Sequence, residues 1–248
     1  MKIDEIIKKK PHLKETLELY MKIRDFKEMD VEGPDEVFPE ELPYSRDDLK
    51  RSLSSISSIF DIGPESLGSL ESAIVSGRIR LREMPMDAEL PDDLSFEEED
   101  LITLLFLISK PFFLSERKRL NLDGVFWDEG RCPICNSTPA VSVIGKEEKR
   151  RFCCSYCETI GPWRRIGCPN CLSEKAEDIT IITLDGEAGM RVDACEKCRH
   201  YYKSFDTQML TEYSPDLLDL ISLPLDIVAQ GKGYNRSAPN PVGMIRMG

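Results

Sequence analysis

Histidine is scarce in this chain, with two residues among 248. General acid–base catalysis relies on histidine more than on any other side chain, so this scarcity argues against most acid–base enzymes. The sequence also lacks the glycine-rich loops that hold phosphates and the Gly-x-Ser-x-Gly motif of a serine nucleophile. We therefore predict no catalytic residues and no organic cofactor, and the chain is not expected to be an enzyme.

Long apolar runs and an excess of basic residues are missing as well. The first ten residues contain no apolar segment of the kind found in a signal peptide. The main apolar run, Leu101 to Ile108, ends at Lys110-Pro111, far short of the roughly 20 residues that span a membrane. The net charge is −12, whereas a nucleic-acid-binding surface needs clustered positive charge. These features predict a cytoplasmic protein without membrane insertion or nucleic-acid binding.

Cysteine, by contrast, is abundant and confined to one stretch between Arg131 and Phe205. Eight of the nine cysteines form Cys-x-x-Cys pairs: Cys132/Cys135, Cys154/Cys157, Cys168/Cys171 and Cys195/Cys198. In a cytosolic protein such pairs favour metal binding over disulfides. Two pairs complete a tetrahedral four-sulfur site, so the sequence predicts two metal ions with four cysteine ligands each.

The intervals between the pairs indicate how the pairs combine. Each interval contains a predicted β-hairpin, formed by residues 141–144 and 150–152 in the first unit and by residues 179–184 and 190–192 in the second. Sequential pairing, which groups the cysteines as 132–157 and 168–198, closes each site over its own hairpin; a crossed pairing stays open. Cys153 lacks the spacing of a ligand and is expected to be a small strand residue. Asn136 follows the first pair and tolerates a left-handed backbone there.

The identity of the metal is not decided by the ligands. Four thiolates leave no open coordination position, so hydrolysis by a metal-bound water is not expected. Zinc would make the sites structural, whereas iron in the same cage could pass one electron. Both metals accept tetrahedral sulfur coordination, and the prediction is therefore iron or zinc.

The remaining segments are predicted to be mainly helical, which gives an α+β fold. We expect an N-terminal α-helical domain over residues 1–125, two tandem rubredoxin- or zinc-ribbon-like units over 126–206, and a C-terminal helix with an extended tail over 207–248. The predicted helices cover residues 4–29 with a break at Pro11, a segment capped by Ser45, residues 64–77 and residues 96–109. Residues 30–43 are predicted to be a loop. A further helix begins at Ser214-Pro215 and is interrupted at Pro224.

Several short motifs recur in one known family. They are Arg131-Cys132-Pro133-Ile134-Cys135, Cys154-Ser155-Tyr156-Cys157, Trp163 with Arg164 and Arg165 before Cys168, Cys195 and Cys198 leading into Tyr202-Lys203, and the closing residues Leu225-Asp226, Gly233-Tyr234, Arg236 and Asn240-Pro241. In these motifs the chain resembles the FdhE-type formate dehydrogenase accessory proteins, over roughly residues 100–243. The resemblance implies a rubredoxin-like, iron-binding, cytoplasmic protein. It also implies an assembly factor that binds the molybdenum- or tungsten-containing catalytic subunit of formate dehydrogenase during maturation.

Two other functions stay open at this point. One is a rubredoxin-type electron-transfer protein, and the other is a zinc-ribbon adaptor in transcription or translation, which the acidic composition disfavours. The tail that contains Tyr234 and Arg236 is expected either to pack back on the body or to meet the partner. His200 is expected to be a solvated strand residue, with hydrogen bonding near the second site as the alternative.

Overall fold

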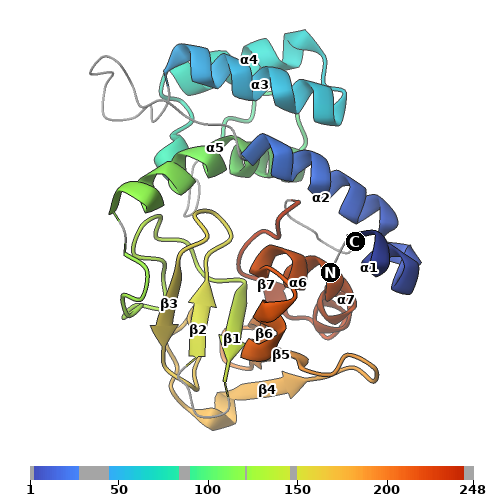
Figure 1. The fold of residues 1–248 in the computed structure, drawn as a ribbon. Helices are drawn as coiled ribbons and strands as arrows, with labels where there is room; N and C mark the ends of the chain where they lie inside the picture. The colour runs from blue at the N-terminus through green and yellow to red at the C-terminus, as the bar shows by residue number, and fades with distance from the viewer. Residues whose placement is uncertain (1–2, 28–44, 84–89, 121, 146–149, 243–248) are drawn as a thin grey trace.

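The computed structural model describes residues 3–27, 45–83, 90–120, 122–145 and 150–242. Its N-terminal part is helical (Figure 1). The helices are α1 Ile3–Lys9, η1 Pro11–Leu13, α2 Lys14–Lys27, α3 Arg46–Phe60, α4 Pro64–Val75, η2 Leu81–Glu83 and α5 Glu98–Leu120. The predicted break at Pro11 and the predicted cap at Ser45 are confirmed, since the Ser45 hydroxyl accepts a hydrogen bond from the backbone N–H of Asp48. The loop predicted over residues 30–43 lies outside the described residues.

Helix α5 extends further than the sequence predicted. The prediction that it ends at Lys110-Pro111 is wrong, because the helix continues through Pro111 to Leu120. A proline inside a helix costs about 3 kcal/mol through a lost hydrogen bond and a steric clash. The next turn buries Phe112 and Phe113, and each buried side chain of this size contributes about 1.5–3 kcal/mol. Packing of these two rings therefore offsets the cost of the proline.

The strands of both cysteine-rich units belong to one sheet. The strands are β1 Val141–Ile144, β2 Arg150–Cys153, β3 Ile160–Trp163, β4 Ile179–Ile182, β5 Met190–Cys195, β6 His200–Asp206 and β7 Asn235–Arg236. Their order is β3-β2-β1-β6-β5-β4, with β7 beside β6. The two predicted hairpins, β1–β2 and β4–β5, are confirmed as antiparallel pairs. A parallel pairing of β1 with β6, from Val141 opposite Lys203 to Ile144 opposite Asp206, joins the two units.

Helices cover this sheet and share their apolar cores with it. One core combines residues of α3, α4 and α5 with the first cysteine-rich unit, and it includes Leu105, Phe106 and Cys157. A second core combines α1 and α2 with the sheet and the C-terminal helices. Each core contains residues from both sides of position 125, the predicted boundary of the N-terminal domain. The division into three domains therefore stays a prediction about which segments fold independently. The α+β class itself is confirmed.

Near the C-terminus, helix α6 Pro215–Ile221 is followed directly by α7 Leu223–Gly231. Ser214 caps α6 by accepting a hydrogen bond from the backbone N–H of Leu217, as predicted, and the break before Pro224 is also present. The short 3-10 helices η3 Ala176–Asp178 and η4 Thr207–Thr211 complete the fold. Among the helices described, none combines the length and the apolar character that a membrane crossing requires.

The tail after α7 packs back on the body instead of extending freely. Strand β7 pairs with the start of β6, where Tyr201 lies opposite Arg236. The Arg236 guanidinium donates to Asp219 Oδ2 at 2.6 Å and to Asp226 Oδ1 at 2.7 Å. The ammonium of Lys203 binds the same two carboxylates, so two positive and two negative charges balance. Of the two alternatives for the tail, packing on the body is the one observed.

All four charged side chains of this network, which joins β6, α6, α7 and β7, are almost completely buried. Burial opposes the ionisation of Asp226, but the charges of Lys203 and Arg236 outweigh burial and lower its pKa. Loss of one partner from such a network leaves an uncompensated buried charge, which costs far more than an exposed ion pair contributes.

We therefore predict that Arg236→Met lowers the free energy of unfolding by about 3–5 kcal/mol, because it leaves two buried carboxylates with one cation. Urea titration followed by circular dichroism measures this loss. The matched control is Arg119→Met, since Arg119 is exposed and pairs with Glu116 on the surface of α5; its urea midpoint should stay close to that of the unchanged chain. Equal midpoints for both variants would contradict a stabilising role of the network.

Candidate metal centres

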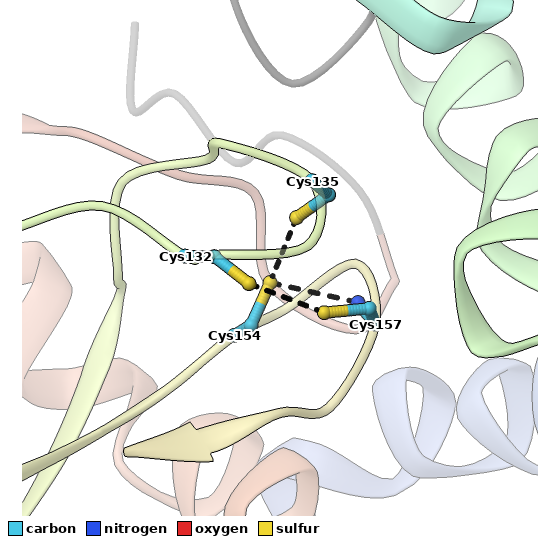
Figure 2. A group of neighbouring side chains, drawn as sticks. All are labelled: Cys132, Cys135, Cys154 and Cys157. Carbon is cyan, nitrogen blue, oxygen red and sulfur yellow. Dashed lines mark hydrogen bonds between the residues drawn. The ribbon is translucent and has the colours of Figure 1, made fainter. Parts of the chain in front are cut away.

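The first centre brings together four sulfur atoms from two turns of the chain. Cys132 and Cys135 precede β1, and Cys154 and Cys157 follow β2 (Figure 2). The Sγ atoms of Cys132 and Cys157 are 3.3 Å apart, as are those of Cys135 and Cys154. A tetrahedral ion with metal–sulfur bonds of about 2.3 Å would place its ligands about 3.8 Å apart, so a small expansion would admit the ion.

The second centre has the same plan with slightly wider spacing. Cys168 and Cys171 precede η3, Cys195 ends β5, and Cys198 lies in the turn before β6. The Sγ–Sγ distances are 3.5 Å for Cys168–Cys198 and 3.7 Å for Cys171–Cys195. All four ligand atoms lie within 4.8 Å of one another in each group. The sequential grouping of the pairs is thus the one observed, and the crossed grouping is not.

Each Cys-x-x-Cys pair is closed by the same backbone turn. The residue after the second cysteine has a positive φ of 58–60° at Asn136, Glu158, Leu172 and Arg199. Its backbone N–H donates to the carbonyl of the first cysteine, at 2.9 Å from Asn136 to Cys132 and at 2.9–3.1 Å in the other three turns. The left-handed conformation predicted at Asn136 is confirmed. Glu158, Leu172 and Arg199 adopt it although their side chains disfavour it, so the turns hold these backbones in a strained region.

Hydroxyl groups next to the first centre were not predicted from the sequence. The Ser137 hydroxyl lies 3.2 Å from Cys135 Sγ and 3.1 Å from Cys154 Sγ, and the Thr159 hydroxyl lies 3.0 Å from Cys157 Sγ. Both residues stand two positions after the second cysteine of a pair, where Ser173 also stands. This repeated position could have indicated from the sequence that hydroxyl groups lie next to the cysteine sulfurs. Hydroxyl donors of this kind orient ligands and moderate the negative charge on the sulfur atoms.

The second centre has an amide and an imidazole in place of these hydroxyls. His200 stands at the equivalent position after the fourth pair, and its Nδ1 lies 3.2 Å from the Asn170 side-chain nitrogen and 2.9 Å from the Cys198 carbonyl. A protonated Nδ1 donates to the Cys198 carbonyl, whereas an unprotonated Nδ1 accepts from the Asn170 amide, so the tautomer decides which of the two hydrogen bonds forms. His200 is half-buried in β6, so the alternative of hydrogen bonding near the second site describes it better than that of a solvated strand residue.

Local hydrogen bonding favours the thiolate form of one cysteine in each centre. Burial opposes ionisation of Cys154, but hydrogen bonds from the other three cysteines lower its pKa well below the usual range. Burial also opposes ionisation of Cys198, but hydrogen bonds from the backbone N–H of His200 and from the Asn170 side chain outweigh it and lower the pKa to about 6. The thiolate is the form of cysteine that binds metals.

Cys153 lies outside both groups. It is the last residue of β2, as its predicted role as a strand residue requires, and burial raises the pKa of its thiol to about 12. All nine cysteines are free of disulfides. Each four-cysteine group can therefore hold a metal ion, and we propose the eight paired sulfurs as the ligands of two ions. When bound, each ion would cross-link two turns and leave no open coordination position.

The fold and these two centres define a class of protein, a double four-cysteine ribbon covered by helices. Residues 166–242 match the family described as "FdhE, C-terminal domain". The chain is 29% identical over 144 residues to "Protein FdhE homolog" of Aquifex aeolicus, with 56% of this chain and 51% of that protein covered. It is 33% identical over 122 residues to the homolog of Stutzerimonas stutzeri, with 46% and 38% covered.

One solved structure of an FdhE protein is similar to this chain in its fold. The FdhE protein from Pseudomonas aeruginosa matches with a TM-score of 0.59 and 18% identity, over 92% of this chain and 89% of that one. The sequence matches span about half or less of the curated relatives' length. The comparisons thus show that part of this sequence is similar to FdhE proteins and that the whole fold is similar to one of them, which agrees with the resemblance carried by the sequence motifs.

We predict that Cys132→Ser and Cys168→Ser each lower the bound metal from two ions to one per chain, because each removes one of four ligands from a different centre. Elemental analysis of the purified full chain measures the ratio. Cys153→Ser is the matched control and should retain two ions. Unchanged metal content in both ligand variants would exclude the proposed assignment.

Proposed function

We propose that this protein is an accessory factor in the maturation of formate dehydrogenase, and that it binds the catalytic subunit of that enzyme through its metal-stabilised double ribbon. The observation that carries the proposal is the match of residues 166–242 to the FdhE C-terminal domain. This segment contains the second four-cysteine group, strands β4 to β7 and the buried charge network. The proposed place of action is the cytoplasm.

The geometry of the centres supports a binding role over a catalytic one. Four sulfurs surround each candidate ion, and a metal with four protein ligands has no position for a substrate or a reactive water. What a closed site supplies is rigidity, since metal binding to such a site is coupled to folding of the surrounding loops. A rigid, partner-specific surface on the ribbons is the property that an assembly factor requires.

The buried tail narrows the candidate binding surface. Tyr234 and Asn240 are buried, and Arg236 is held in the charge network. These residues, which belong to the motifs shared with FdhE-type proteins, therefore stabilise the fold. We accordingly assign partner binding to the exposed parts of the ribbons and not to the tail. Tyr234 contributes to this packing through its ring, which lies 3.9 Å below the Arg199 guanidinium.

A rubredoxin-type electron carrier is the second candidate, and it has one observation in its favour. Cys171 and Cys198 are only half-buried, and an electron carrier needs a centre near the surface. The two candidates differ in metal chemistry, because electron transfer needs iron whereas a structural role also accepts zinc. The visible absorption spectrum of the purified protein separates them: a colourless, zinc-containing protein excludes the electron carrier.

We predict that the tagged full chain retains the formate dehydrogenase catalytic subunit of the same organism in a pull-down. The double variant Cys132→Ser/Cys168→Ser should lose most of this retention, because the ribbons lose the metal-held geometry that presents the surface. Formate dehydrogenase activity in cells that carry only this variant should fall in parallel.

The control for this experiment is Cys153→Ser, which alters a cysteine outside both centres and should behave like the unchanged chain. Circular dichroism on the double variant checks that the helices α1 to α5 persist. Full retention and full activity with both centres emptied would remove the ribbons from the mechanism, and failure of the unchanged chain to retain the subunit would reject the proposed partner.

A further inference from the structure

The two centres differ sharply in burial. All four cysteines of the first centre are enclosed, with exposed fractions of 2% at Cys132, 4% at Cys135, 3% at Cys154 and 0% at Cys157. In the second centre Cys168 and Cys195 are each 1% exposed, but Cys171 and Cys198 are half-buried and reach the surface. One ligand from each turn of the second centre is thus accessible to solvent.

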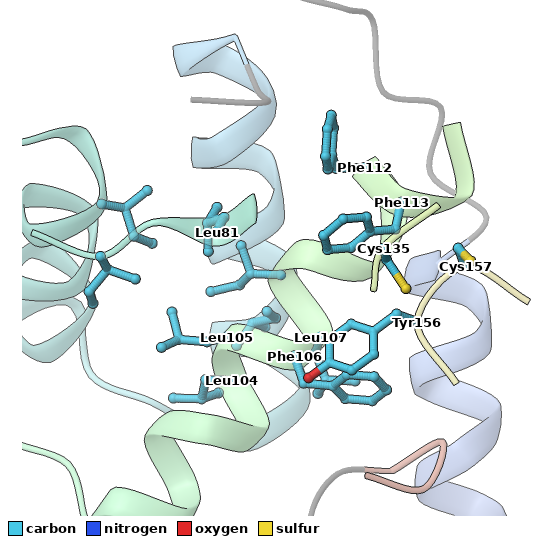
Figure 3. Close-up of a cluster of buried hydrophobic side chains, with 14 of the residues drawn as sticks. Leu81, Leu104, Leu105, Phe106, Leu107, Phe112, Phe113, Cys135, Tyr156 and Cys157 are labelled. Carbon is cyan, nitrogen blue, oxygen red and sulfur yellow. The ribbon is translucent and has the colours of Figure 1, made fainter. Parts of the chain in front are cut away.

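The first centre is enclosed because helix α5 packs directly on it. Tyr156 lies between the two cysteines of the second turn, and its ring meets Phe106 edge-on at 4.6 Å and Phe113 at 6.0 Å (Figure 3). All four cysteines of this centre belong to the apolar core that includes α5. A small pocket borders Cys154, but that residue is 3% exposed. An external molecule therefore reaches these sulfurs mainly when the core opens, which is a rare event for a well-packed region.

The second centre has no comparable cover. Within the described residues, none of its four cysteines belongs to either apolar core. The residues beside its first turn are exposed apolar side chains, with Ile166 at 48% and Leu172 at 44%. The polar neighbours Asn170 and His200 are themselves half-buried. Approach to Cys171 and Cys198 therefore requires no opening of the core.

We propose that the second centre is an exchangeable metal site, from which a small chelator or thiol withdraws the ion while the first centre stays loaded. The step is a ligand exchange that begins at the exposed ligands Cys171 and Cys198. Each metal–sulfur bond that breaks is replaced by a bond to the incoming ligand, the freed thiolate takes a proton from water, and no electron is transferred.

This division separates two roles within one sheet. The first centre joins α5 to β1 and β2 and stabilises the fold, whereas the second can respond to the supply of metal or of competing thiols. The inference rests on metal binding by the eight cysteines and does not depend on the formate dehydrogenase partner. The two proposals can therefore fail independently.

The test uses the full chain loaded with two Zn²⁺ ions and challenged with the coloured chelator 4-(2-pyridylazo)resorcinol. We expect one equivalent to be released quickly and the second at least about tenfold more slowly. Cys171→Ser should remove the fast phase and leave the slow one. Phe106→Ala should accelerate the slow phase and leave the fast phase unchanged, because it loosens only the cover of the first centre.

Alkylation by N-ethylmaleimide of the zinc-loaded chain provides a second measurement that needs no variant. Mass spectrometry should find Cys171 and Cys198 modified before Cys135 and Cys157. The proposal would be overturned if both zinc equivalents left in a single phase or if neither left. It would also be overturned if the first alkylated cysteine belonged to the first centre, or if the chain took up no zinc.

Discussion

Four sulfur atoms can converge on one point only where the chain reverses sharply after each Cys-x-x-Cys pair, and the rest of this structure depends on that reversal. Each of the four turns places one residue in the left-handed region and closes with a hydrogen bond to the first cysteine's carbonyl. Three of these residues, Glu158, Leu172 and Arg199, pay a conformational penalty that neither asparagine nor glycine would incur to the same degree. The turns also set the directions in which β2 and β5 reach the centres and in which β1, β3 and β6 leave them.

The parallel pairing of β1 with β6 turns two small ribbons into one sheet. On one face of this junction the hydroxyls of Ser142 and Ser204 lie 2.7 Å apart, and Asp193 accepts hydrogen bonds from Ser204 and Arg191. The other face directs Lys203 into the charge network with Asp219 and Asp226. The Ser142–Ser204 contact pairs polar groups across the junction, whereas Lys203 joins β6 to the C-terminal helices α6 and α7. A shift in register would break the hydroxyl contact, which favours the observed pairing of the two ribbons.

Local features of the structure were predictable from the sequence. The sequential grouping of the cysteine pairs, the caps at Ser45 and Ser214 and the two hairpins each depend on residues close in the sequence, and all are present in the structure. Features that depend on distant residues were not predicted. The pairing of β1 with β6 joins segments separated by more than fifty residues, and the burial of Arg236 depends on carboxylates from two helices.

Two further features that were not predicted, strand β3 and the end of helix α5, also depend on tertiary packing. Strand β3 contains Gly161 and Pro162, which normally argue against a strand. It tolerates Pro162 because it lies at the edge of the sheet, and it requires Gly161 because a Cβ there would lie 2.2 Å from the Trp127 indole nitrogen. Helix α5 continues past Pro111 because its next turn is buried. In both places tertiary packing overrides the propensity of single residues.

Both four-cysteine groups are inferred to close around one ion each, with sulfur as the sole ligand type. X-ray absorption fine structure at the metal edge, recorded on the purified full chain, tests this inference most directly. We expect a first shell of four sulfur scatterers at about 2.3 Å and no nitrogen or oxygen neighbour, averaged over both ions. A first shell that contains oxygen or nitrogen, or fewer than four sulfurs, would contradict it.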